Sequence, residues 1–375
     1  MLTIHSHTIL KMKQIIMSKL FLAAVVLSLF AACSSREIPI RHYGQFIKEE
    51  NCSWGETPSQ LVDAMLYSSS SACGDSTERF FAYNGQIVKY NFLDSSYGLV
   101  AYANAVHNIV SASDAHVWFI EYRNCLIDAL SGQALHFDSK IPLFDTSYSV
   151  VPYQELPVIN NRIYTSIFTT DKGLHHSEPP RMPHIASWHL YDDTIVFDTL
   201  FGSFPKDYPY DNEGTSHLSK FIFNADDSLL VFYSGMMGTV VVYNLDGELI
   251  GERYIGSQRF RKLNKLSYED FFDMSKFTEW GKNNTVYHKL VYDPYRKVYL
   301  RAMRLPAKTD KNAMEVDECQ WILVVADRNF NIKYEVLFDN DSYRVASRIM
   351  PTPQGVYIEK IVDKNEVQTD LFVFD

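Results

Sequence analysis

The sequence predicts an all-β fold, and a β-propeller is the architecture that its pattern favours. Aromatic residues make up 14% of the chain, with 24 Tyr and 24 Phe, and such residues favour strands. Residues 239–252, TVVVYNLDGELIGE, read as strand, turn and strand, and looser versions recur as CLIDALSGQAL, WHLYDDTIVF and VVADRNFNIKY. Repeated antiparallel strands of this kind stack as four-stranded blades around an axis. We expect six blades and one or two short inserted helices.

Length and charge narrow the class of protein. The chain has 375 residues, 46% of them hydrophobic and 21% charged, which indicates a globular protein with one large β domain or two smaller ones. The net charge of −10 argues against a nucleic-acid partner. The densest basic cluster, Arg259, Arg261, Lys262 and Lys265, is interpreted as a solvated face.

Residues 1–32 are predicted to be a lipoprotein signal peptide, with Met17 as an alternative start. Lys19 precedes an apolar run, LFLAAVVLSLFAAC, that is too short to be a stable spanning helix. The run ends in two Ala residues and Cys33, the pattern at which bacterial lipoproteins are cleaved and lipidated on the thiol. The alternative is an ordinary signal peptide cut after Ala32, which leaves Cys33 unmodified.

Lipidation at Cys33 predicts a membrane partner and a location in the cell envelope. Ser34 and Ser35 lack the Asp that suggests retention in the inner membrane. The outer membrane is therefore favoured, and the choice between its periplasmic and outer faces stays open. Residues 33–74 are assigned to the anchor and a spacer with a short helix near Thr57, where Thr57 and Gln60 form a capping box. Residues 75–375 are assigned to the propeller.

The strands of the propeller are expected in hairpins, because apolar runs alternate with turn-forming residues. The expected turns are at Asn84-Gly85, Ser131-Gly132, Asn160-Asn161, Asp192-Asp193, Asp226-Asp227, Gly235–Gly238, Asp246-Gly247, Asp293-Pro294 and Asn329. Between two of these hairpins, a capping box at Ser267 and Asp270 predicts a helix over 266–281 that ends at Gly281. The last strand, LFVFD, is expected to close the ring by completing the first blade.

The remaining cysteines predict little chemistry. Cys52 and Cys73 flank a short segment and are placed to close a loop, whereas Cys125 and Cys319 lie in strand-like runs and are expected to be buried thiols. No C-x-x-C pair occurs, so neither a redox pair nor a thiolate zinc site is indicated.

No catalytic or cofactor motif is present. Zinc-helix, phosphate-loop and nucleophile-elbow patterns are all absent, so we expect no catalytic residue and no cofactor. One segment, LHHSEPPRMPHIASWH, is the best metal candidate, but adjacent His side chains diverge and its Pro content is typical of a connecting loop. We therefore expect no metal site there. Its candidate ligands are His175, His176, Glu178 and His184.

Residues 201–217, FGSFPKDYPYDNEGTSH, form the loop with the strongest binding pattern. The loop is aromatic and polar, and loops on rigid scaffolds often carry function. The candidate binding residues are Phe204, Tyr208, Tyr210 and Asp211. An ordered insertion without a ligand is the alternative interpretation.

Two segments carry a family resemblance. KLVYDPYRKVYLRAM contains Tyr292, Asp293, Tyr299 and Arg301, and GVYIEK follows near the C-terminus. With the lipoprotein signal, these segments resemble the TolB-like six-bladed propeller lipoproteins classed as domain of unknown function 4221. The resemblance implies a fold and an envelope location, and it brings no catalytic signature.

Two functions are consistent with these observations. The first is a lipid-anchored, non-catalytic module that binds a protein, peptide or glycan. The second is a propeller hydrolase or lyase that acts on a carbohydrate or peptide. The absence of a recognisable nucleophile or metal pattern favours the first. The fold alone cannot decide between them, because propellers host both roles.

Overall fold

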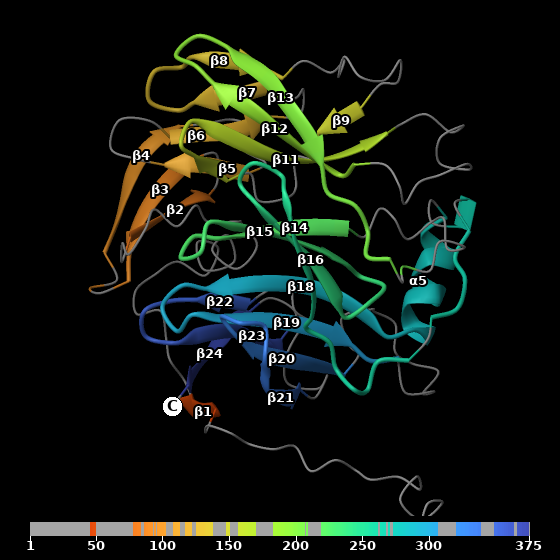
Figure 1. Cartoon of the computed structure of the whole chain (residues 1–375). Helices are drawn as coiled ribbons and strands as arrows, with labels where there is room; N and C mark the ends of the chain where they lie inside the picture. The colour runs from red at the N-terminus through yellow and green to blue at the C-terminus, as the bar shows by residue number, and fades with distance from the viewer. Residues whose placement is uncertain are drawn as a thin grey trace, which may run out of the picture. The chain divides into compact units, whose positions relative to one another are not determined.

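The computed structural model is an all-β protein with one helix of more than two turns among the residues it describes (Figure 1). It describes residues 46–49, 78–83, 86–92, 94, 96–102, 108–112, 117–121, 125–137, 148–150, 157–169, 183–206, 208, 219–261, 263–267, 269–270, 273–306, 320–338, 349–363 and 366–374. The chain divides into two units, Met1–Arg41 and His42–Asp375. All described residues belong to the second unit, which is a β-propeller.

The described strands form six antiparallel sheets, numbered here in chain order. Sheet 1 contains β2 (Glu78–Tyr83), β3 (Gln86–Asn91) and β4 (Tyr97–Tyr102); sheet 2 contains β5 (Asn108–Ala112), β6 (Val117–Glu121), β7 (Cys125–Asp128) and β8 (Ala134–His136); sheet 3 contains β9 (Tyr148–Val150), β10 (Val158–Ile159), β11 (Arg162–Thr169), β12 (Ile185–Leu190) and β13 (Ile195–Phe201). Sheet 4 contains β14 (Ser219–Asn224), β15 (Leu229–Ser234), β16 (Thr239–Asn244) and β17 (Leu249–Tyr254); sheet 5 contains β18 (Val286–Asp293), β19 (Val298–Arg304), β20 (Trp321–Asp327) and β21 (Ile332–Phe338); sheet 6 contains β22 (Ile349–Pro351), β23 (Val356–Asp363), β24 (Glu366–Phe374) and β1 (Phe46–Glu49).

The predicted all-β propeller is confirmed, but the prediction of six regular four-stranded blades is wrong. Five blades have four or fewer strands, and β9–β13 form a larger sheet. That sheet is irregular because β11 is eight residues long. Its first residues pair with β10 and its last residues pair with β9, so two short strands share one edge of β11.

Apolar clusters between neighbouring sheets hold the propeller together. Trp118 of sheet 2 and Trp188 of sheet 3 belong to one cluster, and Val231 of sheet 4 and Val324 of sheet 5 belong to another. Further clusters join sheet 3 to sheet 4 and sheet 5 to sheet 6. Sheets 2 to 6 therefore bury apolar side chains against their neighbours, as blades that are unstable alone must do.

In sheets 2, 4 and 5 a polar side chain at the end of the third strand caps the turn that follows. This cap explains why an Asp or Asn recurs at this point of the sequence pattern. Asp128, Asn244 and Asp327 end β7, β16 and β20, and in each the side-chain Oδ1 accepts the N–H two residues on, at 3.3, 3.0 and 2.9 Å. Asp and Asn favour such turns because they mimic a backbone turn. The predicted turn at Asn160-Asn161 is confirmed by φ angles of 51° and 58°, which a primed hairpin turn requires. The Asn84-Gly85 turn lies outside the described residues.

The ring is closed by the N-terminal strand, which corrects the prediction for LFVFD. β1 pairs antiparallel with β24, with Phe46 opposite Phe374 and Glu49 opposite Leu371. The N-terminal strand thus completes the last sheet, and the C-terminal strand does not complete the first. The four residues of β1, Phe46–Glu49, lie within 33–74, the range that was predicted to form the anchor and spacer.

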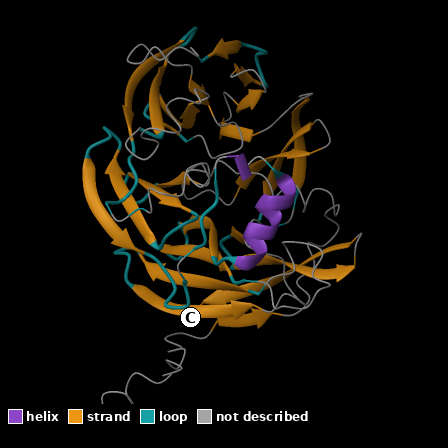
Figure 2. Cartoon of the chain, turned by 90° about the vertical axis from the view of Figure 1, so that its right-hand side faces the viewer, coloured by secondary structure: helices purple, strands orange, loops and turns teal. Residues whose placement is uncertain are grey.

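The predicted helix over 266–281 is interrupted: Glu269 and Asp270 are helical, and after the non-helical Asp273 the chain forms α5 (Met274–Asn283) (Figure 2). Asp273 caps α5 by accepting the N–H groups of Ser275 and Lys276. The predicted cap, Ser267, accepts the N–H of the helical residue Asp270 at 3.0 Å. Gly281 lies inside the helix and the C-cap is Asn284. The helix predicted near Thr57 lies outside the described residues. None of the described helical residues forms a helix long and apolar enough to cross a membrane.

Candidate functional site

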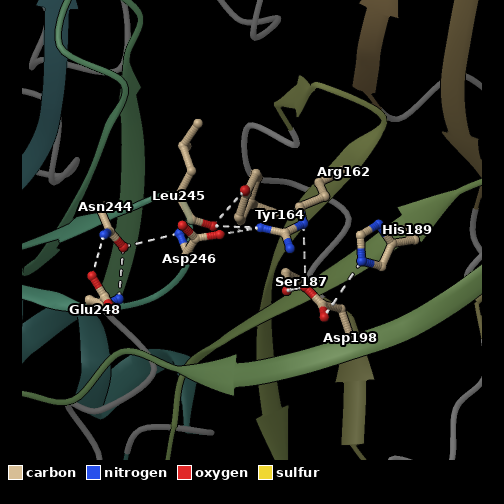
Figure 3. A network of polar contacts seen from close by, with 9 residues as sticks. All are labelled: Arg162, Tyr164, Ser187, His189, Asp198, Asn244, Leu245, Asp246 and Glu248. Atoms are coloured by element: carbon tan, nitrogen blue, oxygen red, sulfur yellow. Dashed lines mark hydrogen bonds and ion pairs between the residues drawn. The ribbon is translucent and has the colours of Figure 1, made fainter.

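Arg162 is the centre of a polar network between sheets 3 and 4 (Figure 3). Its Nη1 donates to Asp246 Oδ1 at 2.7 Å, and its Nε lies 3.5 Å from Asp198 Oδ2. The hydrogen bond with Asp246 raises the pKa of Arg162. Tyr164 donates from its hydroxyl to the Leu245 carbonyl at 2.8 Å. Sheet 3 therefore holds the turn between β16 and β17 of the next sheet at two points.

The turn between β16 and β17 is held in shape by hydrogen bonds among its own residues. Asn244 Oδ1 accepts the N–H groups of Asp246 and Glu248, and Asn244 Nδ2 donates to Glu248 Oε2 at 2.8 Å. Arg162 contacts this turn through the Asp246 side chain, which is 70% exposed, and through the Leu245 carbonyl at 3.4 Å. Because an exposed ion pair contributes little to stability, about 0–1 kcal/mol, the network mainly fixes the register between the two sheets.

Ser187, His189 and Asp198 lie together in this network, but they do not form a catalytic triad. Ser187 Oγ donates to Asp198 Oδ2 at 2.8 Å, and His189 Nε2 lies 3.6 Å from Asp198 Oδ1. In a triad the nucleophile hydrogen-bonds the imidazole, and the carboxylate orients that imidazole from its other side. Here serine and histidine both contact the carboxylate, so the histidine is not placed to take the serine proton. Ser187 is also only 1% exposed.

A second network joins sheets 4 and 5 and contains two residues of the family-like segment. The Tyr292 hydroxyl contacts Asp226 Oδ2, and Asn224 Nδ2 donates to the Tyr299 hydroxyl at 2.7 Å. Arg328 Nε donates to both carboxylate oxygens of Asp227 at 2.7 Å, which lowers the pKa of Asp227. In both networks a charged turn between the third and fourth strands of one sheet meets the first hairpin of the preceding sheet.

Arg301 is a buried cation whose hydrogen bonds reach backbone oxygens in and beside the strands of sheet 4. Its guanidinium donates to four carbonyls of residues 234–255, at distances between 2.6 and 3.0 Å. The guanidinium carbon lies 4.1 Å from the centre of the Tyr287 ring, within cation–π range. Burial lowers the pKa of Arg301 to about 10, so the side chain is charged at neutral pH.

Asp293 and Arg296 link sheet 5 to sheet 6. Asp293 is fully buried and accepts Arg296 Nε at 2.6 Å, and burial raises the pKa of this carboxyl. Arg296 Nη2 then donates to the carbonyls of Thr352 and Gly355 in the turn between β22 and β23. The four residues that carry the family resemblance therefore either contact a neighbouring sheet directly or, in the case of Asp293, hold the side chain that does.

His288, which was not among the predicted site residues, has a strongly lowered pKa. It lies in β18, and burial together with the charges of Arg304 and Lys220 lowers its pKa to about 3. Histidine in an unfolded chain has a pKa near 6.5. The folded chain therefore keeps His288 neutral at pH values where the unfolded chain protonates it.

We expect this histidine to make the fold less stable in acid. Because the pKa of His288 is lowered in the folded chain, the stability that this residue contributes is fully present above pH ~6.5. That stability is lost progressively as the pH falls from there toward 3. Between pH 7 and pH 5, the free energy of unfolding of the parent should fall by about 1 to 2 kcal/mol more than that of His288→Gln. Urea unfolding at the two pH values measures this difference, and equal losses in the two proteins would show that His288 is not responsible.

The structure places only some of the predicted site residues. Phe204 and Tyr208 are buried and stack on each other, with ring centres 3.9 Å apart, and His184 packs against Phe204 and Phe232. These rings serve core packing between sheets 3 and 4. Of the other candidates, His175, His176, Glu178, Tyr210 and Asp211 lie outside the described residues. Within the described residues, no group of three His, Cys, Asp or Glu is placed to hold a metal.

Cys125 is buried in β7, as predicted. Its Sγ lies 3.9 Å from His136 Nε2. Cys33, Cys52, Cys73 and Cys319 lie outside the described residues, so lipidation and the proposed loop closure stay predictions.

Comparison with known proteins supports the fold. No protein-family model matches the sequence, and no curated protein matches it. Among solved structures, a member of the duf4221 family from Bacteroides vulgatus superposes with a TM-score of 0.61 at 16% identity, over 84% of this chain and 94% of that chain. Regucalcin, a calcium-binding protein from Agrobacterium tumefaciens, superposes with a TM-score of 0.42 at 9% identity, over 88% and 94% of the two chains. The first likeness shows a shared fold.

Proposed function

We propose that this chain is a lipid-anchored, non-catalytic β-propeller of the cell envelope that binds a protein, peptide or glycan. One observation carries the non-catalytic part. The polar clusters around Arg162, Arg301 and Asp293 all make contacts between sheets or support them, and the serine, histidine and aspartate beside Arg162 lack the contact between nucleophile and base.

The anchored part rests on the N-terminal sequence. An apolar run ending in Ala-Ala-Cys33 is the pattern of a bacterial lipoprotein. The fold shared with the Bacteroides vulgatus protein agrees with the family resemblance from which the envelope location was inferred. We propose the outer membrane as the location, with Cys33 as the lipidated residue.

Metabolic labelling tests the anchor. The full chain is expressed in a Gram-negative host that is fed an alkyne-tagged palmitate, and the label is read on the purified protein. We expect the parent and Cys125→Ala to carry label and Cys33→Ser to carry none, because the acyl chains are attached through Cys33. Membrane fractionation alone is a weaker test, since an uncleaved signal peptide also binds membranes.

Label on Cys33→Ser equal to that on the parent would contradict the proposal. Cys125→Ala is the matched control, because it also removes one thiol and lies within β7.

A further inference from the structure

Tyr254, the last residue of β17, packs a half-exposed aromatic ring against the backbone of two glycines. The side chain is 51% exposed, and a Cβ atom added to Gly238 or Gly256 would lie 2.6 Å from the ring. Neither glycine has a positive φ angle, so the path of the backbone does not require glycine here. A glycine in such a position often marks a close approach, and here the approaching group is the tyrosine ring.

The hydroxyl end of the same ring is also held. The Tyr254 hydroxyl donates to the Ser257 carbonyl at 3.4 Å, and that carbonyl accepts the Phe260 N–H at 3.1 Å. The ring is therefore fixed by packing and by a hydrogen bond, while much of the side chain stays open to solvent. An aromatic ring that is ordered in advance offers a large contact area to a ligand at a low cost in conformational entropy.

Contacts with sheet 5 hold the turn at residues 257–260 in place. The buried Tyr287 of β18 accepts the Ser257 N–H through its hydroxyl at 2.9 Å and stacks its ring on Phe260, with ring centres 5.0 Å apart. Glu335 of β21 accepts the Ser257 Oγ–H at 2.8 Å and the Gln258 N–H at 3.3 Å. The turn is therefore a rigid support, and residues on loops held by such supports often bind ligands.

Arg259 extends from this turn as a cation without a counter-ion in the described part of the chain. Its N–H donates to Ser257 Oγ at 3.1 Å, so the Arg259 backbone and the Tyr254 hydroxyl both contact Ser257. The Arg259 side chain is exposed, and its guanidinium forms no hydrogen bond or ion pair with a described residue. The aromatic ring and the arginine therefore belong to one small, ordered surface.

The two carboxylates nearest to this turn in the structure have other hydrogen-bond donors. Glu335 accepts the two bonds that hold the turn, and Glu252 Oε1 accepts the Lys206 N–H at 3.2 Å. Since neither carboxylate pairs with Arg259, its guanidinium keeps the capacity for a charge-assisted, bidentate contact with an anionic group.

The residues around Tyr254 are polar, which favours a glycan over a protein as the ligand. The exposed residues that flank it in the sequence are mostly charged: Glu252, Arg253, Gln258, Arg259 and Arg261. The centre of a protein–protein interface is depleted of charged residues, whereas an acidic sugar needs an aromatic ring for its C–H face and a cation for its carboxylate. In a chain with a net charge of −10, a basic loop is also where an acidic ligand is attracted.

We propose that Tyr254 and Arg259 form a binding site for an acidic glycan, with the tyrosine ring stacked on a sugar and the guanidinium bound to a sugar carboxylate. The proposal rests on the proposed binding function and selects one ligand class, the glycan, from the three that this function allows. An acidic polypeptide shares the negative charge but has no sugar ring to stack on Tyr254, so the experiment includes one as a competing ligand.

Affinity electrophoresis of the full chain in detergent tests the site. Native gels contain polygalacturonate, alginate or hyaluronate as acidic glycans, galactan as the neutral control, or polyglutamate as the acidic polypeptide. We expect at least one of the three acidic glycans to slow the migration of the parent and galactan to have no effect. The dependence of migration on polymer concentration gives the Kd for each variant.

Four variants separate the site from general charge effects. Tyr254→Ala should raise the Kd about tenfold, as expected for an aromatic residue at the centre of a binding site, and Tyr254→Phe, which keeps the ring, should bind almost as well as the parent. Arg259→Gln should raise the Kd about tenfold, because it removes a charge-assisted contact. Tyr97→Ala is the matched control: Tyr97 is 50% exposed in β4 of sheet 1, and its removal should leave the Kd unchanged.

Three results would overturn the glycan site: no retardation by any of the three acidic glycans, retardation by polyglutamate alone, or equal effects of Tyr254→Ala and Tyr97→Ala. Retardation by polyglutamate alone would leave the proposed binding module in place with an acidic polypeptide as its partner. Shortening of a bound glycan during incubation would instead contradict the non-catalytic function and leave the site supported. None of these results bears on the lipid anchor, which palmitate labelling tests separately.

Discussion

Replacing Arg301 with Met is expected to lower the free energy of unfolding by about 4 kcal/mol, the largest effect that we predict. The guanidinium is fully buried and donates to the carbonyls of Ser234, Met237, Gly238 and Ile255. Met fills similar volume but removes all four of these hydrogen bonds. Because the variant no longer buries a charge, it avoids the desolvation cost of the guanidinium, and this offsets part of the loss in stability.

Urea unfolding of the two proteins measures the effect. Arg253→Met is the control, because Arg253 is exposed and its one hydrogen bond to a described residue goes to the carbonyl of its neighbour Glu252. This variant should change the free energy of unfolding by less than about 0.5 kcal/mol. Arg301→Lys keeps the charge but loses the planar set of N–H donors. Its free energy of unfolding should therefore lie between those of Arg301→Met and Arg253→Met. If Arg301→Met and Arg253→Met unfolded at the same urea concentration, the packing role assigned to Arg301 would be wrong.

Asp293→Ala is expected to lower the free energy of unfolding by about 3 kcal/mol, because it breaks a buried ion pair by removing one partner. The carboxylate accepts the N–H groups of Tyr295 and Arg296 and the Nε of Arg296. Without this carboxylate, the turn after β18 loses its side-chain cap. Arg296 also loses the contact that orients its guanidinium toward the carbonyls of Thr352 and Gly355 in sheet 6.

A comparison with Asp246→Ala isolates the effect of burial in this second experiment. Asp246 also pairs with an arginine of a neighbouring sheet, but it is 70% exposed, so its removal should cost less than about 1 kcal/mol. Chemical unfolding of both variants under one set of conditions makes the comparison. Equal losses would mean that burial of Asp293 contributes nothing.

Local chemistry explains which parts of the fold could be predicted from the sequence. The strands and their turns follow from apolar runs and from Asn, Asp and Gly at positions with special φ angles, such as Asn160, Asn161 and Gly247. The pairing of β1 with β24 joins the two ends of the domain, and no local pattern records such a contact. The helix over 266–281 was predicted as continuous because the apolar spacing does not reveal the interruption at Asp273, which caps α5, whereas Ser267 accepts the N–H of the helical Asp270.

The candidate networks were harder to predict for the same reason. Arg162 and Asp246 are 84 residues apart, so their proximity depends on how the sheets stack. The segment with Tyr292, Asp293, Tyr299 and Arg301 was recognised, yet its role became visible only through the partners of these residues in sheets 4 and 6. His288 drew no attention because a single histidine in a strand has no sequence signature.

The most direct test of the non-catalytic assignment is labelling of the full chain with a fluorophosphonate, which reacts with activated serines. Our account predicts that Ser187 stays unlabelled, because its hydroxyl donates to Asp198 and is buried. Label that is present on the parent and lost in Ser187→Ala would contradict it, and the hydrolase hypothesis would then replace the binding module.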